Sequence, residues 1–244
     1  AVSVLTGILS RSPSVRARRN AVWVLARISG TEAREGVRRA LADSNASVKH
    51  AAIHAVGIWR DANAFEALAA ELKRGGGHDA IKRVSAEALG RIGDTRAVPY
   101  LLDAVTEEGL DEVLVHSLTY ALIEIGNPKM TRLGLKSQSR QARRAALLAL
   151  DQMDQHALDS SAVIPLLSSP DPILSGTAEW ITGRHPEWGR ELSGFFNHRL
   201  RNLSVDEQTA LEQQLRKFVG DPTIQQLVAK VVVRPGKTPA RLTA

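Results

Sequence analysis

The chain has 244 residues, of which 43% are hydrophobic and 24% are charged, proportions that are typical of folded rather than disordered proteins. It contains no cysteine, which excludes disulfides, thiolate metal sites, iron–sulfur clusters, covalently attached c-type haem and a catalytic thiol within this sequence. No apolar run approaches the roughly 20 residues of a membrane-spanning helix, so we expect no membrane partner. The sequence begins with Ala rather than Met, and we expect it to be a piece of a larger protein.

The formal net charge is +6, and the positive charges are concentrated at the N-terminal end. Residues 1–60 contain 10 Lys and Arg against 3 Asp and Glu, a net charge of +7, whereas residues 61–244 contain 22 against 23, a net charge of −1. A basic segment of this kind attracts acidic protein surfaces or phosphate groups by Coulomb attraction. A solvated helix face would show the same excess, so charge alone does not define a site.

A repeat with the spacing of an α-helix organises residues 1–185. Apolar anchor residues recur at spacings of 31, 33, 33, 28 and 31 residues, namely Leu25, Val56, Leu89, Leu122, Leu150 and Ile181. An apolar or small residue stands eight positions before each anchor, which places both on one stripe of a helix. Gly57 and Gly90 lie in this stripe, and we expect them to let neighbouring helices approach closely.

Further predicted helices lie between these, at residues 34–43, 64–74 and 97–107, and turn signals separate the two sets. No segment shows the alternating pattern of a β-strand. One short hairpin cannot bury its own apolar face, but hairpins stacked in series share a continuous core. The sequence therefore predicts an all-α fold: an α-solenoid of about six helical hairpins, with one or two extra C-terminal capping helices.

The predicted organisation has three parts: the repeat array at residues 1–185, a C-terminal helical cap at residues 186–233, and a tail or linker at residues 234–244. The cap is expected to close the end of the array, because a terminal repeat otherwise exposes its apolar face. Its apolar stripe consists of Phe195, Phe196, Leu200, Leu211, Leu215 and Phe218.

One stretch carries a family resemblance. The segment IKRVSAEALGRIGDTRAVPYLLDAV at residues 81–105 resembles the HEAT-like repeat of the phycobilisome-lyase type, and the resemblance extends over roughly residues 1–185. It implies the fold of the array. It implies little about activity, because such repeats occur in scaffolds, lyases, nucleic-acid enzymes and regulators.

A narrower resemblance concerns residues 179–196 and 212–232, which are similar to the end of the helical region in large multidomain proteins of planctomycete-type bacteria. In those proteins a propeller-like dehydrogenase domain precedes the helical repeats and a haem-binding c-type cytochrome domain follows them. This chain has no Cys-x-x-Cys-His motif and no propeller, so the resemblance implies only the middle module. It also implies a periplasmic or cell-envelope location.

The common catalytic motifs are missing: there is no Gly-x-Ser-x-Gly, no His-Glu-x-x-His and no phosphate-binding glycine-rich loop. His50 and His54 have the spacing of two metal ligands on one helix, but no third ligand lies near them in sequence, so we expect neither a metal nor a cofactor. His185 and His198 flank Trp188, and we expect them to serve packing or capping.

The second helix of each hairpin lines the concave face in HEAT-type stacking, and residues four apart stay on nearly the same face of a helix. Three rows therefore cross that face. The third position of each second helix is Arg19, His50, Arg83, His116, Arg144 and Ser175. The seventh position is Trp23, His54, Glu87, Tyr120, Leu148 and Glu179. The eleventh position is Arg27, Ile58, Arg91, Glu124, Gln152 and Gly183.

The candidate partner-binding residues come from these rows and are Arg19, Trp23, Arg27, His50, His54, Arg83 and Tyr120. Arginine pairs with carboxylate or phosphate through two N–H groups, and Trp and Tyr offer a wide contact area. The arginines have an alternative role, which is to join hairpins by pairing with an Asp of the neighbouring turn.

The sequence favours a non-catalytic protein-interaction or spacer scaffold that binds an acidic protein surface, or a neighbouring domain, on its concave face. We therefore expect no enzyme activity. One alternative is a HEAT-like DNA-binding glycosylase with a basic concave groove, although the excess of basic residues ends near residue 60. Another is a bilin lyase, which only the name of the repeat type suggests.

Overall fold

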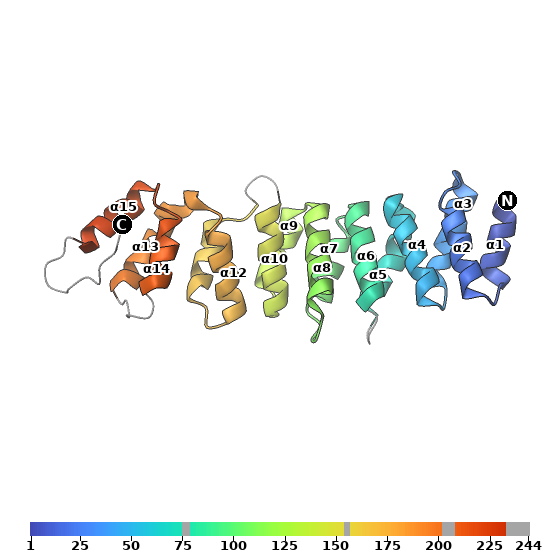
Figure 1. Ribbon diagram of the computed structural model, residues 1–244, viewed down its shortest axis with the longest axis horizontal. Helices are drawn as coiled ribbons and strands as arrows, with labels where there is room; N and C mark the ends of the chain where they lie inside the picture. The colour runs from blue at the N-terminus through green and yellow to red at the C-terminus, as the bar shows by residue number, and fades with distance from the viewer. Residues whose placement is uncertain (75–78, 154–156, 202–207, 233–244) are drawn as a thin grey trace. The chain divides into compact units, whose positions relative to one another are not determined.

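The computed structural model describes residues 1–74, 79–153, 157–201 and 208–232. Within these ranges the chain forms α-helices and short 3-10 helices and no β-strand, so the predicted all-α fold is confirmed (Figure 1). The contacts divide the chain into two compact units, Ala1–Ala157 and Leu158–Ala244. No helix in the described ranges is both long enough and apolar enough to cross a membrane.

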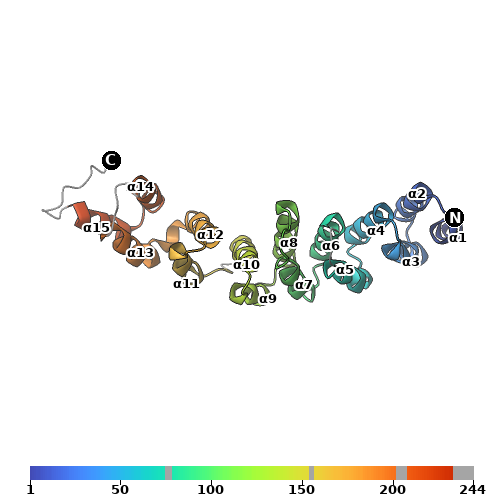
Figure 2. The same cartoon turned by 90° about the horizontal axis from the view of Figure 1, so that it is seen from below.

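The first unit is a stack of helical hairpins. Its α-helices are α1 (Val2–Arg11), α2 (Val15–Leu25), α3 (Thr31–Arg39), α4 (Ala46–Ile58), α5 (Phe65–Leu72), α6 (Asp79–Ile92), α7 (Ala97–Ala104), α8 (Glu112–Ile125), α9 (Pro128–Thr131) and α10 (Arg140–Gln152). Its 3-10 helices are η1 (Ala40–Ala42), η2 (Ala62–Ala64) and η3 (Arg132–Lys136). Figure 2 shows α2, α4, α6, α8 and α10 as one layer and α3, α5, α7 and α9 as the other.

Four helices of the first layer, α2, α4, α8 and α10, follow a residue whose side chain accepts a hydrogen bond from a free backbone N–H group. Ser14 accepts from Ala17 ahead of α2, and Asp111 accepts from Leu114 at 2.6 Å ahead of α8. Such N-caps satisfy donors that have no partner inside the helix, and losing one costs about 1 kcal/mol. They fix where these four helices start.

The predicted repeat anchors form the core. All six are at most 1% exposed: Leu25, Val56, Leu89, Leu122, Leu150 and Ile181. Gly57 and Gly90 lie at close approaches between helices, as expected, since a Cβ atom at Gly57 would lie 3.0 Å from the Cβ atom of Ala88. A Cβ atom at Gly90 would lie 3.0 Å from the Cα atom of Ala121. The small residues of the repeat thus bring α4, α6 and α8 into near-backbone contact.

Ion pairs join successive hairpins of the first unit. The pairs are Arg18 with Asp43, Arg38 with Asp61, Lys49 with Glu71, and Lys82 with Glu107. The Lys82 side chain is only 2% exposed, so its ammonium group depends on Glu107 for compensation. The sequence analysis considered pairs of this kind for the arginines of the rows, but it did not predict them at these residues.

The second unit contains the sixth hairpin and three further helices within the described residues. Its elements are α11 (Ser160–Val163), η4 (Ile164–Ser168), α12 (Pro172–Thr182), η5 (Pro186–Trp188), α13 (Gly189–Arg201), α14 (Gln208–Arg216) and α15 (Pro222–Val232). The expectation of one or two helices after the repeats was therefore too low, because residues 208–232 form two separate helices. A turn that contains Gly220 and Asp221 separates them, and Asp221 accepts hydrogen bonds from the first N–H groups of α15.

The apolar residues expected to form the C-terminal stripe pack together. Leu192, Phe196, Leu211, Leu215, Phe218 and Ile224 form one buried cluster, and Phe195 and Leu200 pack against it. The boundary at residue 186 and the role of residues 186–233 as a cap stay predictions. The predicted tail at residues 234–244 lies outside the described residues.

Candidate functional site

The three predicted rows lie on the exposed side of the second helices of the first unit. We call this surface the second-helix face; it consists of Arg19, Trp23, Arg27, His50, His54, Ile58, Arg83, Glu87, Arg91, His116, Tyr120, Glu124, Arg144, Leu148 and Gln152. Three large hydrophobic side chains on this face are exposed to solvent: Trp23 by 40%, Tyr120 by 49% and Ile58 by 60%. Exposed aromatic side chains of this kind are frequent in protein interfaces.

Side chains of the rows contact one another across helices. The Trp23 ring of α2 meets the His54 ring of α4 edge-on, with 5.7 Å between the ring centroids. The Arg91 guanidinium of α6 reaches over Gly57 of α4, where a Cβ atom would lie 3.7 Å from Nη1. These contacts link α2 to α4 and α6 to α4 along the second-helix face.

The position of His50 on this surface lowers its pKa. Partial burial of the ring has the largest effect, and the charges of His54 and Arg83 act in the same direction, while Glu87 opposes them. An ordinary imidazole titrates near pH 6.5, so His50 is neutral at neutral pH. It then acts as a hydrogen-bonding group rather than as a cation.

The sequence left two roles open for the arginines of the rows: binding a partner, or joining hairpins through ion pairs. Three of the four cations that join hairpins stand one position before the third-position row, at Arg18, Lys49 and Lys82. Within the described part of the chain, Arg19, Arg27 and Arg83 form no ion pair with a carboxylate.

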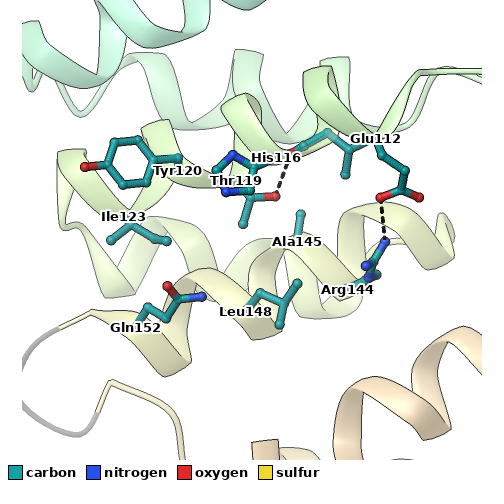
Figure 3. A pocket seen from close by; sticks show the side chains of 10 residues that line it. Glu112, His116, Thr119, Tyr120, Ile123, Arg144, Ala145, Leu148 and Gln152 are labelled. Atoms are coloured by element: carbon teal, nitrogen blue, oxygen red, sulfur yellow. Dashed lines mark hydrogen bonds and ion pairs between the residues drawn. The ribbon is translucent and has the colours of Figure 1, made fainter. Parts of the chain in front are cut away.

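A groove with a volume of about 140 Å³ lies between α8 and α10 on the same face (Figure 3). Its lining residues are Glu112, Val115, His116, Thr119, Tyr120, Ile123, Arg144, Ala145, Leu148 and Gln152. The sequence predicted Tyr120 as a binding residue, and it placed four other lining residues in the rows without recognising a groove. One feature of the sequence could have indicated the groove: one second helix carries His116 and Tyr120, and the next second helix carries Arg144, Leu148 and Gln152.

The groove has apolar and aromatic walls and an ion pair at one end. The rings of His116 and Tyr120 are parallel within 5°, with centroids 6.3 Å apart. The Arg144 guanidinium lies 3.6 Å from the Glu112 carboxylate, so the rim carries no net charge (Figure 3). The Thr119 hydroxyl donates to the backbone oxygen of Val115 at 2.8 Å and is not available to a ligand as a donor.

One further sequence expectation has a clear outcome, in the second unit. The His185 ring stacks on Trp188 with centroids 4.0 Å apart and contacts Glu187, so its packing role is confirmed. Among the residues that the structure describes, nowhere do three or more His, Asp or Glu side chains gather in a way that could hold a metal ion.

Comparisons with known proteins agree with the fold. Residues 2–76 match the family described as HEAT repeats, and residues 81–107 match the family described as PBS lyase HEAT-like repeat. The solved structure of an archaeal HEAT-like repeats protein from Thermococcus onnurineus NA1 has a TM-score of 0.53 and 11% identity, and the match covers 95% of this chain and 98% of that chain. The chain is therefore an all-α solenoid that contains HEAT-like repeats, a repeat type with an extended surface for protein partners.

A relative in sequence is an enzyme. Deoxyhypusine hydroxylase-B of Oryza sativa subsp. japonica is 30% identical over 233 residues, which is 93% of this chain and 64% of the rice protein. The chain thus spans less than two thirds of the length of this curated relative. The structure of human deoxyhypusine hydroxylase in complex with glycerol matches 96% of this chain and 90% of that chain, with 16% identity and a TM-score of 0.41.

This match corrects the functional expectation. The prediction of a non-catalytic scaffold, and with it the prediction that the chain is not an enzyme, is wrong, because the relative that matches 233 residues is a hydroxylase. This relative gives no support to the alternative of a DNA-binding glycosylase. The prediction failed because it depended on short contiguous motifs, whereas an active site can be assembled from single residues on several helices.

Proposed function

We propose that the chain is the substrate-recognising array of an enzyme that modifies a side chain of a protein, and that the second-helix face binds that protein. The observation that supports an enzyme is the 30% identity over 233 residues to deoxyhypusine hydroxylase-B. The name of that relative identifies deoxyhypusine as the group on which it acts. An extended repeat surface suits a protein substrate better than a small molecule.

The surface favours an acidic segment of the substrate. Arg19, Arg27 and Arg83 present guanidinium groups that are not consumed by ion pairs inside the described part of the unit. A guanidinium group pairs with a carboxylate through two parallel N–H···O bonds. Trp23 and His54 form an aromatic pair between these charges that can cover apolar parts of the segment.

The described residues do not supply the oxygen-activating group that a hydroxylase uses. Hydroxylation converts a C–H bond to C–OH with one atom of O₂, and the other atom is reduced to water with two electrons and two protons. Redox cofactors or metal ions supply this chemistry. The described part of the chain has no cluster of three or more suitable ligands, so it does not fit a metal centre.

The larger context of the array is a separate proposal. The similarity of residues 179–196 and 212–232 to planctomycete-type multidomain proteins supports a bacterial origin and a position between a propeller-like dehydrogenase domain and a c-type cytochrome domain. The sequence of the complete gene tests this proposal. Flanking regions without a propeller or a Cys-x-x-Cys-His motif would contradict it.

The proposal is tested by titrating the purified chain into a fluorescein-labelled peptide that contains deoxyhypusine flanked by glutamates. Fluorescence anisotropy is expected to show binding of the peptide, and the double variant Arg19→Glu/Trp23→Ala is expected to bind at least about tenfold more weakly. Arg39→Glu is the matched control, because Arg39 is an exposed residue of α3 in the other layer.

The rice relative serves as the positive control for the peptide. If it binds the peptide while this chain does not, the proposed role in substrate recognition is wrong. If the double variant binds as tightly as the unmodified chain, the second-helix face is not the substrate-binding surface.

A further inference from the structure

We infer that the second-helix face recognises two features of one extended segment: a run of acidic residues, and a single apolar side chain about eight residues away that enters the groove between α8 and α10. The inference rests on the proposed function in one respect, which is that this face binds the protein substrate. It adds which part of the face takes which chemical group, and how far apart the two groups lie.

The charge of the face changes sign along the layer. On α2, α4 and α6 it carries Arg19, Arg27, Arg83 and Arg91, against the single carboxylate of Glu87. On α8 it carries the exposed carboxylate of Glu124, and on α10 its only cation, Arg144, pairs with Glu112 at the rim of the groove. An acidic segment is therefore attracted to α2, α4 and α6, and electrostatic complementarity disfavours its extension over α8.

The groove next to this boundary has the size and lining for one uncharged side chain. Its volume of about 140 Å³ is close to the roughly 150 Å³ of an apolar cavity that accommodates a benzene molecule. Four aliphatic lining residues form the floor: Val115, Ile123, Ala145 and Leu148. The parallel rings of His116 and Tyr120 form a wall beside it. A phenylalanine side chain fits this combination, whereas a charged side chain would lose hydration without finding an unpaired opposite charge on the rim.

The spacing follows from the stacking of helices. Packed helices lie about 8–10 Å apart, and three such steps separate the α2–α4 contact from the α8–α10 groove, a path of roughly 24–30 Å. An extended chain covers about 3.3 Å per residue, so about eight residues connect the two points. A shorter connection cannot reach both, and the second contact then adds no affinity.

The probe is a fluorescein-labelled synthetic peptide with a run of glutamates, a Gly/Ser spacer and one Phe, studied by fluorescence anisotropy with the complete chain. Spacers of about four and about twelve residues are compared, because only the longer one spans the path. For each spacer a matched peptide carries Ala in place of Phe.

With the long spacer, the Phe peptide is expected to bind about tenfold more tightly than the Ala peptide, since burial of one aromatic side chain supplies an effect of that order. With the short spacer the two peptides should bind equally. The gain should be lost in Leu148→Gln and kept in Leu133→Gln, since Leu133 is 56% exposed on η3, outside the groove.

A Phe effect that is absent with the long spacer, present with the short one, or unchanged in Leu148→Gln would overturn the inference. Such a result leaves the proposed function standing if the glutamate run still binds in a way that depends on Arg19 and Trp23. Failure of every peptide to bind overturns both the inference and the proposed binding surface.

Discussion

Neighbouring residues at the start of the second helices occupy two different regions of the same unit. Arg18 and Lys82 lie against the next hairpin and pair with Asp43 and Glu107, whereas the residue that follows each of them, Arg19 or Arg83, belongs to the second-helix face. Consecutive residues of an α-helix are rotated by about 100° around its axis. One residue step is therefore enough to change a cation from a structural group to one that is available to a partner.

The two regions differ in what the loss of a charge costs. A buried ion pair leaves an uncompensated charge when one partner is removed, while an exposed cation loses little because water replaces its surroundings. Substitutions in the joining pairs should therefore change stability, and substitutions on the second-helix face should change binding.

The largest effect on stability is expected when Glu107 is replaced by Ala, because the almost fully buried ammonium group of Lys82 then loses its carboxylate. The expected loss is about 3 kcal/mol in the free energy of unfolding, measured by urea denaturation followed by circular dichroism. Lys82→Met removes the charge with nearly the same volume and should cost about 1 kcal/mol or less. Arg83→Ala is the matched change on the second-helix face, where Arg83 is half-buried and has no ion pair within the described residues, and it should cost about 1 kcal/mol or less. If Glu107→Ala is no less stable than Arg83→Ala, the contrast between the two regions is wrong.

The pair of Arg18 and Asp43 should make stability depend on pH. The Arg18 guanidinium holds the pKa of the Asp43 carboxyl below its usual value of 3.8, so the folded chain favours the ionised form. The stabilisation is present above the usual pKa and disappears as the pH falls through the lowered one. Arg18→Ala is expected to lower the unfolding midpoint by about 3 °C near pH 7, and the difference from the unmodified chain should shrink near pH 3. A difference that is equally large at both pH values would show that the pair does not cause it.

A smaller pH effect is expected on binding. Partial burial and the charges of His54 and Arg83 lower the pKa of His50, and Glu87 acts against them. A bound acidic segment adds negative charge beside the ring and raises that pKa, so binding takes up a proton and tightens as the pH falls. The affinity for a fluorescent polyglutamate peptide should rise about twofold between roughly pH 7.5 and pH 6, and His50→Gln should reduce this rise. An unchanged rise in His50→Gln would assign the effect to another group.

Sequence periodicity was sufficient for the hairpins and their core, because each apolar anchor recurs in every repeat and a missing anchor would leave a gap in a shared core. It also placed Trp23, His54 and Tyr120 on one surface, since that inference needs only the helical period. The ion pairs needed more information: Lys49 and Glu71 are 22 residues apart, and Lys82 and Glu107 are 25 apart, so their pairing depends on how successive hairpins pack.

The groove and the enzyme relationship were missed for different reasons. The groove depends on the distance between α8 and α10 and on the rotamers of His116 and Tyr120, which no periodic pattern specifies. The helix count after the repeats was too low because the short turn at Gly220 and Asp221 is weak evidence for a break in a mostly helical sequence. The activity was missed because no short motif for it lies in the sequence, and only the comparison with a relative over 233 residues indicated it.

The comparison of Arg18→Glu with Arg19→Glu tests the central claim most directly, because the same charge is reversed at adjacent positions. Both variants are titrated into a fluorescent polyglutamate peptide, and their unfolding midpoints are measured alongside. We expect Arg19→Glu to weaken peptide binding about tenfold with its midpoint nearly unchanged, and Arg18→Glu to lower the midpoint by several degrees. Peptide binding by Arg19→Glu that equals that of the unmodified chain would contradict the claim that the second-helix face recognises an acidic substrate.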